Sequence, residues 1–453
     1  MASTQRAYIV TDLGFGDFGK GTTVEALVRR HQAHTVVRFS GGAQAGHNIV
    51  RPDGTHHTFS QFGAGTFERA RTYLSQHMVV HPTALLVEAA YLERKGITSP
   101  FSLLTVDRRA LMITPFHQAM NRLAELHRGA GAHGSCGIGV GATVGDSYDH
   151  PEDAVRVGDL FDFQTLRAKL KRIQDRMVAE ATIRYPWTPG LPQQFLAERE
   201  ILHYLDIGAY LDSLKPLLYS LTATDEAHWA WLAREPGTMV FENAQGVLLD
   251  EWHGFFPHNT YTNTTHDNAL AMLARVGYSG KVKRLGGVRT YQTRHGQGPF
   301  PTEKATMSQP ELHNNPRCWQ GSWRQGVLDM VLTKYAVKAC GGIDGLVVTH
   351  LDQIPPNWDL CCAYRLGEEG REKDISILPV NPNRIENGVQ TANTDLIRAA
   401  TPVYLFGDSS PNRADRVSSD AVNIFLKMAL DVPVVMGSFG RTVEDKVVYD
   451  PDL

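Results

Sequence analysis

The sequence predicts an α/β protein built as one large domain, residues 1–453, with a central, mostly parallel β-sheet flanked by helices and carrying insertions. Three observations support this fold class. Short apolar, β-branched runs alternate with segments of helical periodicity. The first run leads through a glycine-rich, P-loop-like segment into the first helix, and no internal repeat or low-complexity linker divides the chain. Such alternation is typical of α/β architecture.

The expected strands are continuous apolar runs, which suit strands buried on both faces of a parallel sheet. They lie at Ala7–Val10, Thr35–Phe39, Thr238–Phe241, Gly345–Thr349 and Val432–Met436. Helical periodicity lies between them, at Thr22–His31, Pro115–His127, Phe163–Glu180, Val327–Ala339 and Ser418–Leu430. The stretches Tyr185–Gln193 and Asn357–Asn387 are expected to be surface excursions within the same domain.

Composition excludes several classes of partner. Lys and Arg total 45 against 48 Asp and Glu, a formal net charge of −3, which does not give the broad basic surface of a nucleic-acid-binding protein. No apolar run approaches the roughly 18 residues of a membrane span, and the N-terminus does not resemble a signal peptide. The five cysteines show no CxxC spacing, as expected of a reduced intracellular chain. We therefore expect a cytoplasmic protein with no nucleic-acid or membrane partner.

A glycine-rich loop, within Gly14–Thr23, joins the first strand to the first helix and suits a nucleotide phosphate. Its glycines allow close backbone approach to an anion, and the start of the helix presents free N–H groups. Lys20 adds a cation that can reach a β- or γ-phosphate. Two interpretations fit. The GxxxxGK pattern followed by Gly-Thr resembles nucleoside monophosphate kinases, whereas Asp17 inside the loop suits Mg²⁺ binding or proton abstraction from a second substrate.

Five further segments, taken in order along the chain, resemble the adenylosuccinate synthetase family. That family opens with a GDEGKGK loop and continues with GGxNAGHT, EGAQGTLLD, TSSNTT, YxTRVGxGPFPTE and TKLD. The matching segments are Gly41–Val50, Glu242–Asp250, Thr260–Thr265, Thr290–Glu303 and Thr349–Asp352. Because the resemblance recurs in order over nearly the whole chain, the sequence is identified as a divergent member of this family.

The resemblance implies a two-step ligase that depends on GTP and Mg²⁺. In the family, the γ-phosphate of GTP passes to O6 of inosine monophosphate (IMP). The amine of aspartate then displaces that phosphate to give adenylosuccinate. Asp17 matches the aspartate that takes the proton from purine N1 and contacts Mg²⁺, His47 matches the histidine that supports phosphoryl transfer, and the Gly46 carbonyl matches a metal ligand. The family is homodimeric, so a homodimer is expected.

The remaining family positions fall into three groups. Lys20 and Gln245 complete the catalytic set with Asp17 and His47. Purine-monophosphate and second-substrate contacts are expected from Gln44, Ser135, Thr260, Arg294, Arg317 and Arg324. Nucleotide contacts are expected from Gly16, Phe18, Gly19, Gly21, Thr22, His350, Asp352, Ser438 and Gly440. Among these, the Asp352 carboxylate suits the N1–H and N2–H₂ donors of guanine.

Departures from the family concentrate in the second-substrate segment. The family has an arginine-rich run there that clamps both carboxylates of aspartate. This chain has Pro316–Gln325 instead, in which Arg317 and Arg324 are separated by Trp319 and Trp323. The tryptophans either fill the core of a remodelled loop or line a pocket for a less acidic or larger amine.

Smaller departures lie elsewhere, and a rearranged clamp is a further possibility. Phe18 replaces a family glutamate, Gln44 an asparagine, and His350 a lysine, although an imidazole can still lie on a base face. In the rearranged arrangement, Arg317 and Arg324 would meet, with Arg289 or Arg294 completing the clamp.

Three functional hypotheses follow from these patterns. The first is a ligase that activates a purine 6-oxo group and couples it to aspartate, or a relative that uses another purine or amino donor. The second is a monophosphate kinase, which explains only the first loop. The third is a catalytically impaired nucleotide-binding homologue. It explains the altered second-substrate segment but not the retention of Asp17, Lys20, His47 and Gln245 together.

Overall fold

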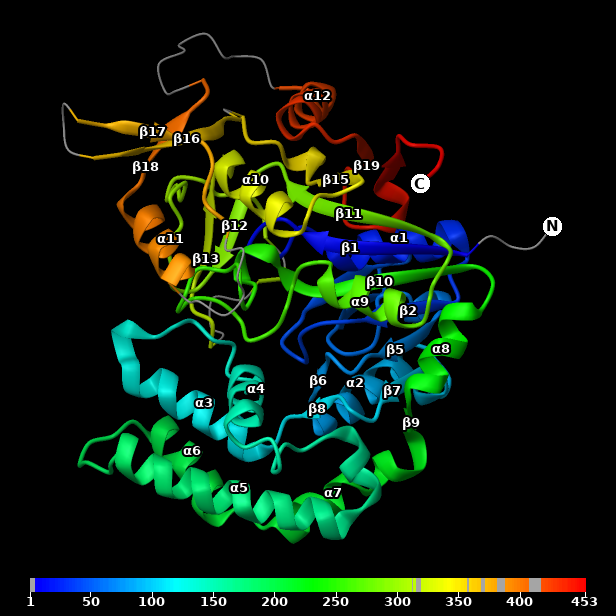
Figure 1. Cartoon of the computed structure of the whole chain (residues 1–453), viewed down its shortest axis with the longest axis vertical. Coiled ribbons are helices and arrows are strands. Elements are labelled where there is room, and N and C mark those ends of the chain that lie inside the picture. Colours follow the sequence, from blue (N-terminus) through cyan, green and yellow to red (C-terminus); the bar gives the residue numbers. More distant parts are fainter. Residues whose placement is uncertain are drawn as a thin grey trace.

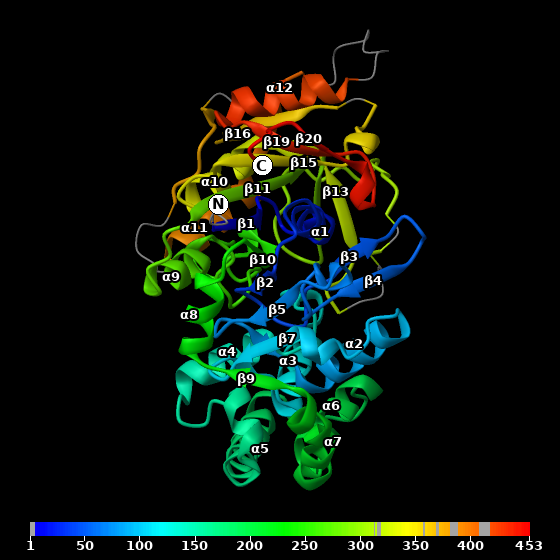
Figure 2. The same cartoon turned by 90° about the vertical axis from the view of Figure 1, so that its right-hand side faces the viewer.

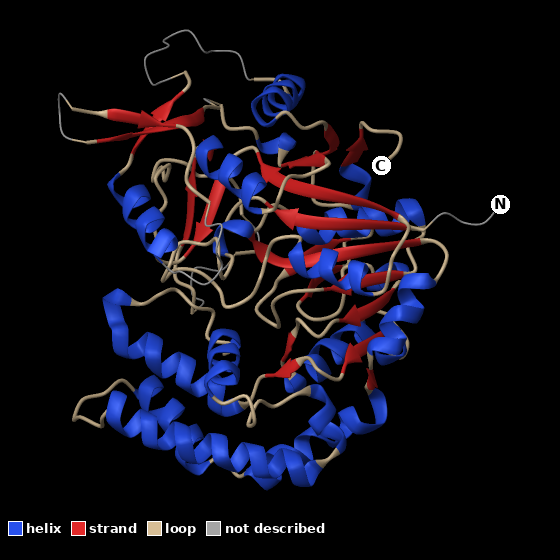
Figure 3. Ribbon diagram, in the orientation of Figure 1, coloured by secondary structure: helices blue, strands red, loops and turns tan. Residues whose placement is uncertain are grey.

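A ten-stranded sheet forms the centre of the computed structural model, which describes residues 5–311, 313–314, 319–356, 358–367, 371–380, 388–406 and 417–453 (Figures 1 and 3). The strand order is β20-β19-β15-β11-β1-β10-β2-β5-β7-β9. Neighbouring strands are parallel apart from β19 and β20, which pair antiparallel. In chain order the strands are β1 (Arg6–Asp12), β2 (Thr35–Arg38), β5 (Arg71–Leu74), β7 (Leu104–Asp107), β9 (Thr222–Thr224), β10 (Thr238–Gly246), β11 (Lys281–Arg289), β15 (Gly345–Thr349), β19 (Val434–Ser438) and β20 (Lys446–Val448).

Helices cover both faces of this sheet, and some form a separate layer. Helices α3, α5, α6 and α7 pack against one another below the sheet in the view of Figure 1, far from the C-terminal strands. Figure 2 shows the same separation from the side. The helices are α1 (Lys20–His31), α2 (Pro82–Arg94), α3 (Pro115–Arg128), α4 (Val140–Asp149), α5 (Phe163–Arg184), α6 (Gln193–Tyr204), α7 (Ile207–Ser220), α8 (Glu226–Arg234), α9 (Asp267–Arg275), α10 (Met330–Ala339), α11 (Gly388–Ala399) and α12 (Ser419–Leu430).

Smaller sheets are attached to this framework. The hairpin of β12 (Gln292–His295) and β13 (Trp323–Gly326) follows β11. The others are β3 (His47–Val50) with β4 (His56–Phe59), β6 (Val79–Val80) with β8 (Leu111–Met112), and a four-stranded sheet of β14 (Leu328–Asp329), β16 (Leu360–Leu366), β17 (Lys373–Ile375) and β18 (Thr401–Tyr404). Short 3₁₀ helices lie at Thr66–Glu68, Pro100–Leu103, Gly129–Gly131, Val157–Phe161, Val247–Leu249, Leu351–Gln353 and Val443–Asp445.

Local sequence explains where several helices begin. Thr114 caps α3 by accepting a hydrogen bond from the His117 N–H, and Pro115 occupies the first turn, where its missing N–H costs nothing. Asp162 caps α5 by accepting from two backbone N–H groups. In α1 no side chain caps the start. The helix instead opens directly from Gly19 in a left-handed conformation, so its first N–H groups face the glycine-rich loop.

The predicted α/β class is confirmed, and the predicted strands and helices lie within a few residues of the observed ones. One boundary was wrong. The helix expected from Val327 begins at Met330, because Leu328 and Asp329 pair with β16 as a strand and the Asp329 carboxylate then caps the helix at the Leu332 N–H, 3.0 Å away. The expected excursion Asn357–Asn387 contributes β16 and β17 to the small sheet.

No helix in the described part of the chain is both long and apolar enough to cross a membrane. The central strand β1 is buried along nearly its whole length, which leaves the carboxyl ends of the central strands as the place where polar loops gather. In open α/β sheets, ligands bind at this edge.

Candidate active site

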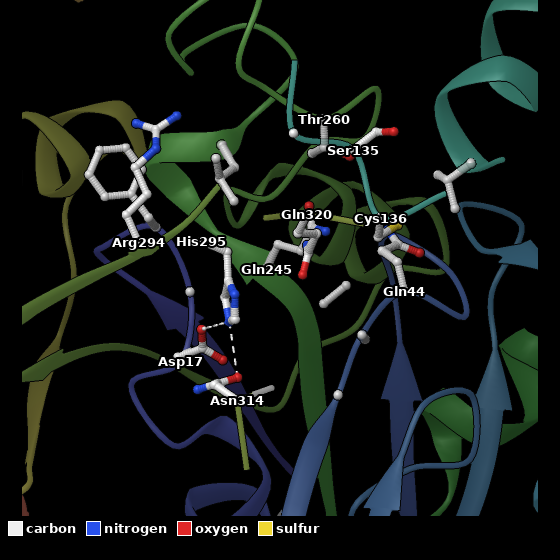
Figure 4. A pocket seen from close by; sticks show the side chains of 18 of the residues that line it. Asp17, Gln44, Ser135, Cys136, Gln245, Thr260, Arg294, His295, Asn314 and Gln320 are labelled. Atoms are coloured by element: carbon white, nitrogen blue, oxygen red, sulfur yellow. Dashed lines mark hydrogen bonds and ion pairs between the residues drawn. The ribbon is translucent and has the colours of Figure 1, made fainter. Parts of the chain in front are cut away.

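One large pocket opens at the carboxyl ends of β1, β10, β11 and β15 and extends to helices α3, α4 and α5 (Figure 4). Segments far apart in sequence meet there. Of the residues predicted from the sequence, the structure brings together in its lining Gly16, Asp17, Phe18, Gly19, Lys20, Gly21, Thr22, Gln44, Gly46, His47, Ser135, Gln245, Thr260, Arg294, His350, Asp352, Ser438 and Gly440. Arg324 lies outside this lining, and Arg317 lies outside the described residues.

The glycine-rich loop is fixed from below by a buried carboxylate, that of Asp12 at the end of β1. The carboxylate accepts hydrogen bonds from the Gly14 N–H at 2.7 Å and the Phe18 N–H at 3.0 Å. It also forms an ion pair with the Lys20 ammonium at 3.0 Å, and both side chains are buried. The loop therefore presents a preorganised backbone, with its lysine held at the first residue of α1.

Phe18 and Thr349 hold the loop from the side of the sheet. The Phe18 ring packs so closely on Gly287 of β11 that a Cβ atom there would lie 2.1 Å from the ring. The Thr349 hydroxyl at the end of β15 donates to the Phe18 carbonyl at 2.5 Å. The phenyl group that replaces the family glutamate is therefore a packing residue, and the N–H and carbonyl groups of Phe18 both have protein partners.

Asp17 has a left-handed backbone conformation, with φ of 65°, which is rare for a residue with a side chain. Its carboxylate points into the pocket, where Oδ2 lies 3.3 Å from Nε2 of His295 (Figure 4). Partial burial raises the pKa of Asp17, but His295, Lys20 and Arg289 together outweigh that effect and hold it below its usual value. An ionised carboxylate in a strained loop position is an arrangement that functional sites use.

His47, the first residue of β3, is held by acceptors at both ring nitrogens. Nδ1 donates to the Glu242 carboxylate at 2.5 Å, and Nε2 lies 3.2 Å from the Ala244 carbonyl oxygen. Glu242 also accepts from the Ala64 N–H at 3.0 Å, which fixes its own orientation. Burial lowers the pKa of His47 although two acceptors favour the protonated ring. Such a histidine is poised to share or release a proton.

Two glutamine amides, that of Gln44 in the turn before β3 and that of Gln245 on β10, have polar atoms without a partner in the pocket. Neither the nitrogen nor the oxygen of the Gln44 amide has a protein partner, and the Gln245 oxygen has none either. Ser135 is fixed nearby, since its hydroxyl accepts from the Asn121 amide at 2.9 Å. Figure 4 shows these groups and Thr260 around the same part of the pocket. Buried amides without partners are costly unless a ligand completes them.

The far end of the pocket is built from the loops after β15 and β19. His350 is fixed by Arg289, whose Nη2 lies 2.7 Å from its Nε2, and its ring packs edge-on against Tyr291. Asp352 is exposed in the pocket. The Ser438 hydroxyl donates to the Gly440 carbonyl at 3.0 Å and shapes the opposite turn. A planar, neutral heterocycle with adjacent donors suits this end.

Two of the arginines expected to clamp a dicarboxylate, Arg294 and Arg324, have protein partners. Arg294 donates to the carbonyl oxygens of Pro299 at 2.8 Å and His258 at 3.2 Å, and lies over the Phe15 ring. Burial lowers its pKa to about 9. Arg324 donates to Glu303 at 2.8 Å and to the Gly298 carbonyl at 2.8 Å. These two guanidinium groups stabilise the hairpin and its neighbouring turn.

The two tryptophans of the second-substrate segment are packing residues. Trp319 packs on Gly137 and beneath the Arg122 guanidinium, whereas Trp323 packs against His295 and Arg289. Neither belongs to the pocket lining. Of the two alternatives raised by the sequence, the structure therefore supports the remodelled core, and the expectation of an aromatic pocket for the amine is not supported.

The profile of the adenylosuccinate synthetase family matches residues 9–394 of the chain. The chain belongs to the adenylosuccinate synthetase family. Members of this family are GTP-dependent C–N ligases, and the protein is an enzyme of that class. The family resemblance inferred from five short segments is thereby confirmed.

Individual adenylosuccinate synthetases align over most of the chain. The enzyme of Synechococcus elongatus is 27% identical, over 98% of this chain and 95% of that protein. The enzyme of Proteus mirabilis is 32% identical, over 79% and 80%. Among solved structures, fully ligated adenylosuccinate synthetase from Plasmodium falciparum aligns with a TM-score of 0.73 at 19% identity, covering 98% of this chain and 99% of that one. Succinoaminodeoxyadenylate synthetase of cyanophage S-2L, bound to dGMP and to dATP as an energy donor, aligns with a TM-score of 0.53 at 17% identity, covering 98% and 95%.

Measured against the adenylosuccinate synthetase motifs, sequence reasoning missed three side chains of the pocket and its supports. His295 stands where the family motif has valine, a substitution visible in the sequence, but its contact with Asp17 was not. Glu242 belongs to a matched motif, yet only the structure shows that it binds His47. Asp12 gave no signal, since its role depends on Lys20 eight residues away.

Proposed function

We propose that the protein transfers the γ-phosphate of GTP to the 6-oxo oxygen of a purine nucleoside monophosphate, with IMP as the family substrate, and then replaces that phosphate by an amine. One observation carries this proposal. Asp17, Lys20 and His47 line a single pocket together with Gln245, so a base, a phosphate-binding cation and a proton-sharing imidazole surround the same space. Neither a simple kinase nor a binding protein requires this set.

The residues fit the activation step. The oxygen of a 6-oxopurine is a poor leaving group, so an amine cannot displace it until it is phosphorylated. The ionised Asp17 carboxylate would accept the N1 proton, which places negative charge on O6 for attack on the γ-phosphorus while GDP leaves. Lys20 and the loop N–H groups would stabilise the phosphates, and His47 would donate to the transferring group.

The amine step completes the balance of atoms. The amine nitrogen bonds to C6, the C6–oxygen bond breaks, and inorganic phosphate leaves with the former 6-oxo oxygen. The amine gives up one proton. The Gln44 amide and the Gln245 amide oxygen, which lack protein partners, would bind the purine nucleotide, with Thr260 and Ser135 at its phosphate. In the family the amine is that of aspartate.

Mg²⁺ fits the site as an ion bound jointly by oxygen ligands of the protein and of the substrate. In the described ranges, no group of three or more His, Cys, Asp or Glu side chains could hold a metal ion by itself. Mg²⁺ commonly takes one or two protein oxygens and completes its shell with phosphates and water. Asp17 and the Gly46 carbonyl would supply those oxygens, and the ion would neutralise charge on the γ-phosphate.

GTP is the proposed phosphoryl donor because the far end of the pocket offers an acceptor for guanine. The exposed carboxylate of Asp352 would accept from N1–H and N2–H₂, while adenine presents an acceptor at N1. Ser438 and Gly440 would close over the base.

A homodimer remains a prediction from the family. Sedimentation analysis of the protein in solution would test it.

The decisive experiment measures phosphate release from GTP with a panel of purine monophosphates, with and without hydroxylamine. Hydroxylamine is a small nucleophile, so it tests activation without depending on recognition of a larger amine. Phosphate release that needs both the purine and the amine supports the proposal. Formation of a nucleoside diphosphate without amine would indicate a kinase, and no reaction at all would indicate a binding protein.

A further inference from the structure

The turn that joins β19 to β20, residues 438–446, forms part of the nucleotide end of the pocket, and we call it the base turn. Its pocket-lining residues are Ser438, Gly440, Arg441, Thr442 and Asp445. Lys446, the first residue of β20, lies outside the lining. The base turn therefore has one side that faces the pocket and another side that holds a lysine.

The Lys446 ammonium binds two carbonyl groups of the base turn. Its Nζ donates to the Gly440 carbonyl at 3.0 Å and to the Thr442 carbonyl at 2.8 Å. Two carbonyl oxygens that converge in this way repel each other unless a donor lies between them. A hydrogen bond from a charged donor is roughly twice as strong as a neutral one. Lys446 therefore fixes the direction of both carbonyls.

Side chains of the base turn fix the rest of its backbone. Asp445 Oδ2 accepts from the Thr442 N–H at 2.8 Å and from the Thr442 hydroxyl at 2.7 Å. The Phe439 N–H donates to the Asp445 carbonyl at 2.9 Å, and the Ser438 hydroxyl donates to the Gly440 carbonyl at 3.0 Å. A Cβ atom at Gly440 would lie 2.6 Å from the Asp445 carboxylate. The turn is therefore closely packed and preformed.

Three carboxylates attract the Lys446 ammonium, those of Asp445, Glu25 and Asp352. Burial lowers the pKa of Lys446 to about 8, and the three carboxylates oppose that effect, so the amine keeps its proton near neutral pH. Glu25 is buried on α1, the helix that begins at the phosphate loop and packs against Val443–Asp445. The lysine is therefore part of a charge cluster that connects the helix of the phosphate loop with the segments proposed to bind the base.

The direction of the Gly440 carbonyl also sets that of the next N–H group. The Gly440–Arg441 peptide is trans, and in a trans peptide the carbonyl and the following N–H point in opposite directions. Because the Gly440 carbonyl points to Lys446, the Arg441 N–H points away from it. A backbone N–H that faces the edge of a purine meets an acceptor, O6, in guanine, but a donor, the N6 amino group, in adenine.

We propose that Lys446 is a positioning residue for the phosphoryl donor, whose ammonium holds the base turn in the conformation that accepts guanine and disfavours adenine. It acts through the carbonyls of Gly440 and Thr442 and does not touch the nucleotide. This inference rests on the proposed GTP-dependent function, and it adds to Asp352 a second determinant of base choice.

Calorimetry with GTP and ATP on Lys446→Met tests the proposal. Methionine keeps an unbranched apolar chain but removes the donor that the two carbonyls share. We expect the Kd for GTP to rise about tenfold and the ratio of the ATP Kd to the GTP Kd to fall about fivefold. Unchanged GTP affinity, or equal weakening of both nucleotides, would overturn the inference and leave the ligase function standing. An unmodified protein that binds no GTP would remove the GTP assignment and this inference with it.

Turnover with GTP, purine nucleotide and hydroxylamine separates donor binding from chemistry. Lys446→Met should raise KM for GTP about tenfold and change kcat by less than about twofold, because Lys446 does not reach the reacting atoms. The matched control is Lys283→Met, which removes another half-buried lysine, paired with Asp450 outside the pocket lining. It should change neither parameter. A fall in kcat at constant KM, or equal effects in the two variants, would contradict the proposal.

Two further variants distinguish positioning from stability. Lys446→Arg keeps a cation with several N–H donors, so its Kd for GTP should stay within about threefold of that of the unmodified protein. Lys446→Gln removes the charge and can reach one carbonyl at most, so an intermediate loss is expected. An arginine variant as weak as the methionine variant would show that the charge is not responsible. Failure of both Lys446→Met and Lys446→Gln to fold, with Lys283→Met folded, would assign Lys446 to stability alone, contrary to the proposal.

A double variant shows by which route Lys446 acts. In the Asp352→Asn background, Lys446→Met should still weaken GTP binding about fivefold or more, because the two carbonyls of the base turn lose their donor there as well. If Lys446 acted through the charge of Asp352 instead, its substitution would have no effect in that background. That result would contradict a role through the base turn.

Discussion

The phosphate loop and a second group of side chains, Arg289, His295, Glu311 and Asn314, line one pocket but hold their charges in different ways. The loop fixes its lysine and its backbone through Asp12, a residue of the same contiguous strand, turn and helix. The second group comes from the end of β11, from β12 and from the segment after β12, and side-chain contacts join its members. The loop is therefore a short, self-contained unit, whereas the second group depends on contacts between distant segments that single substitutions can change.

This difference explains which family features persist in the chain. Asp17, Lys20 and His47 all remain, as expected if the proposed transfer of a phosphoryl group to O6 makes the same demands for any amine. The arginine-rich run is gone, and tryptophans pack in its place. When different residues serve the two proposed steps, those of the first step can be retained while those of the second step change.

The largest effect on turnover is expected from Asp17→Asn. We expect turnover with GTP, purine nucleotide and hydroxylamine to fall by about 10²- to 10⁴-fold, because an amide keeps the shape but cannot accept the purine proton. Calorimetric GTP binding should change little. Activity near that of the unmodified protein would remove Asp17 from the role of base.

The self-contained character of the loop predicts a large stability effect for Asp12→Asn. Removing one partner of a buried ion pair costs about 3–5 kcal/mol, since Lys20 is left without its carboxylate. Urea unfolding would measure the loss in the free energy of unfolding. Asp374→Asn, which disrupts an exposed pair with Arg365, is the control and should change little. Equal small effects would show that the loop does not depend on Asp12.

Glu242→Gln sharpens the contribution of His47. The substitution removes the negative partner of Nδ1, and hydrogen bonds to charged groups are worth about 1.5–3 kcal/mol, which corresponds to roughly 10- to 100-fold in rate. We expect that loss in kcat with a nearly constant KM for GTP. A lower melting temperature together with an unchanged kcat would show that Glu242 contributes to stability alone.

The smallest expected effect concerns the nucleotide base. Asp352→Asn should reduce the preference for GTP over ATP by about tenfold, equal to about 1.4 kcal/mol, because an asparagine retains one acceptor and presents a donor in place of the other. Calorimetry with both nucleotides would measure the preference. ATP binding as tightly as GTP to the unmodified protein would contradict the assignment of Asp352, and His350 would then deserve testing.

Sequence patterns predicted much of this molecule because they are local. Buried parallel strands appear as apolar runs, as at Gly345–Thr349, and the loop before Lys20 has the spacing that a phosphate requires. The features that sequence patterns did not predict depend on contacts between distant residues, in particular on which acceptor a charged side chain meets in the folded protein. Arg294 looked like a carboxylate clamp, yet its two Nη atoms donate to the carbonyls of Pro299 and His258. The contact of His295 with Asp17 joins residues 278 positions apart and has no local signature.

The contact between Phe18 and Gly287 limits which residues these two positions can hold together. Any side chain at Gly287 would place Cβ 2.1 Å from the Phe18 ring, and a glutamate at position 18 would enter an apolar niche. The two positions are therefore epistatic. A side chain at position 287 therefore requires a smaller residue at position 18, and relatives that carry an aromatic residue before the loop glycine should carry glycine on the neighbouring strand.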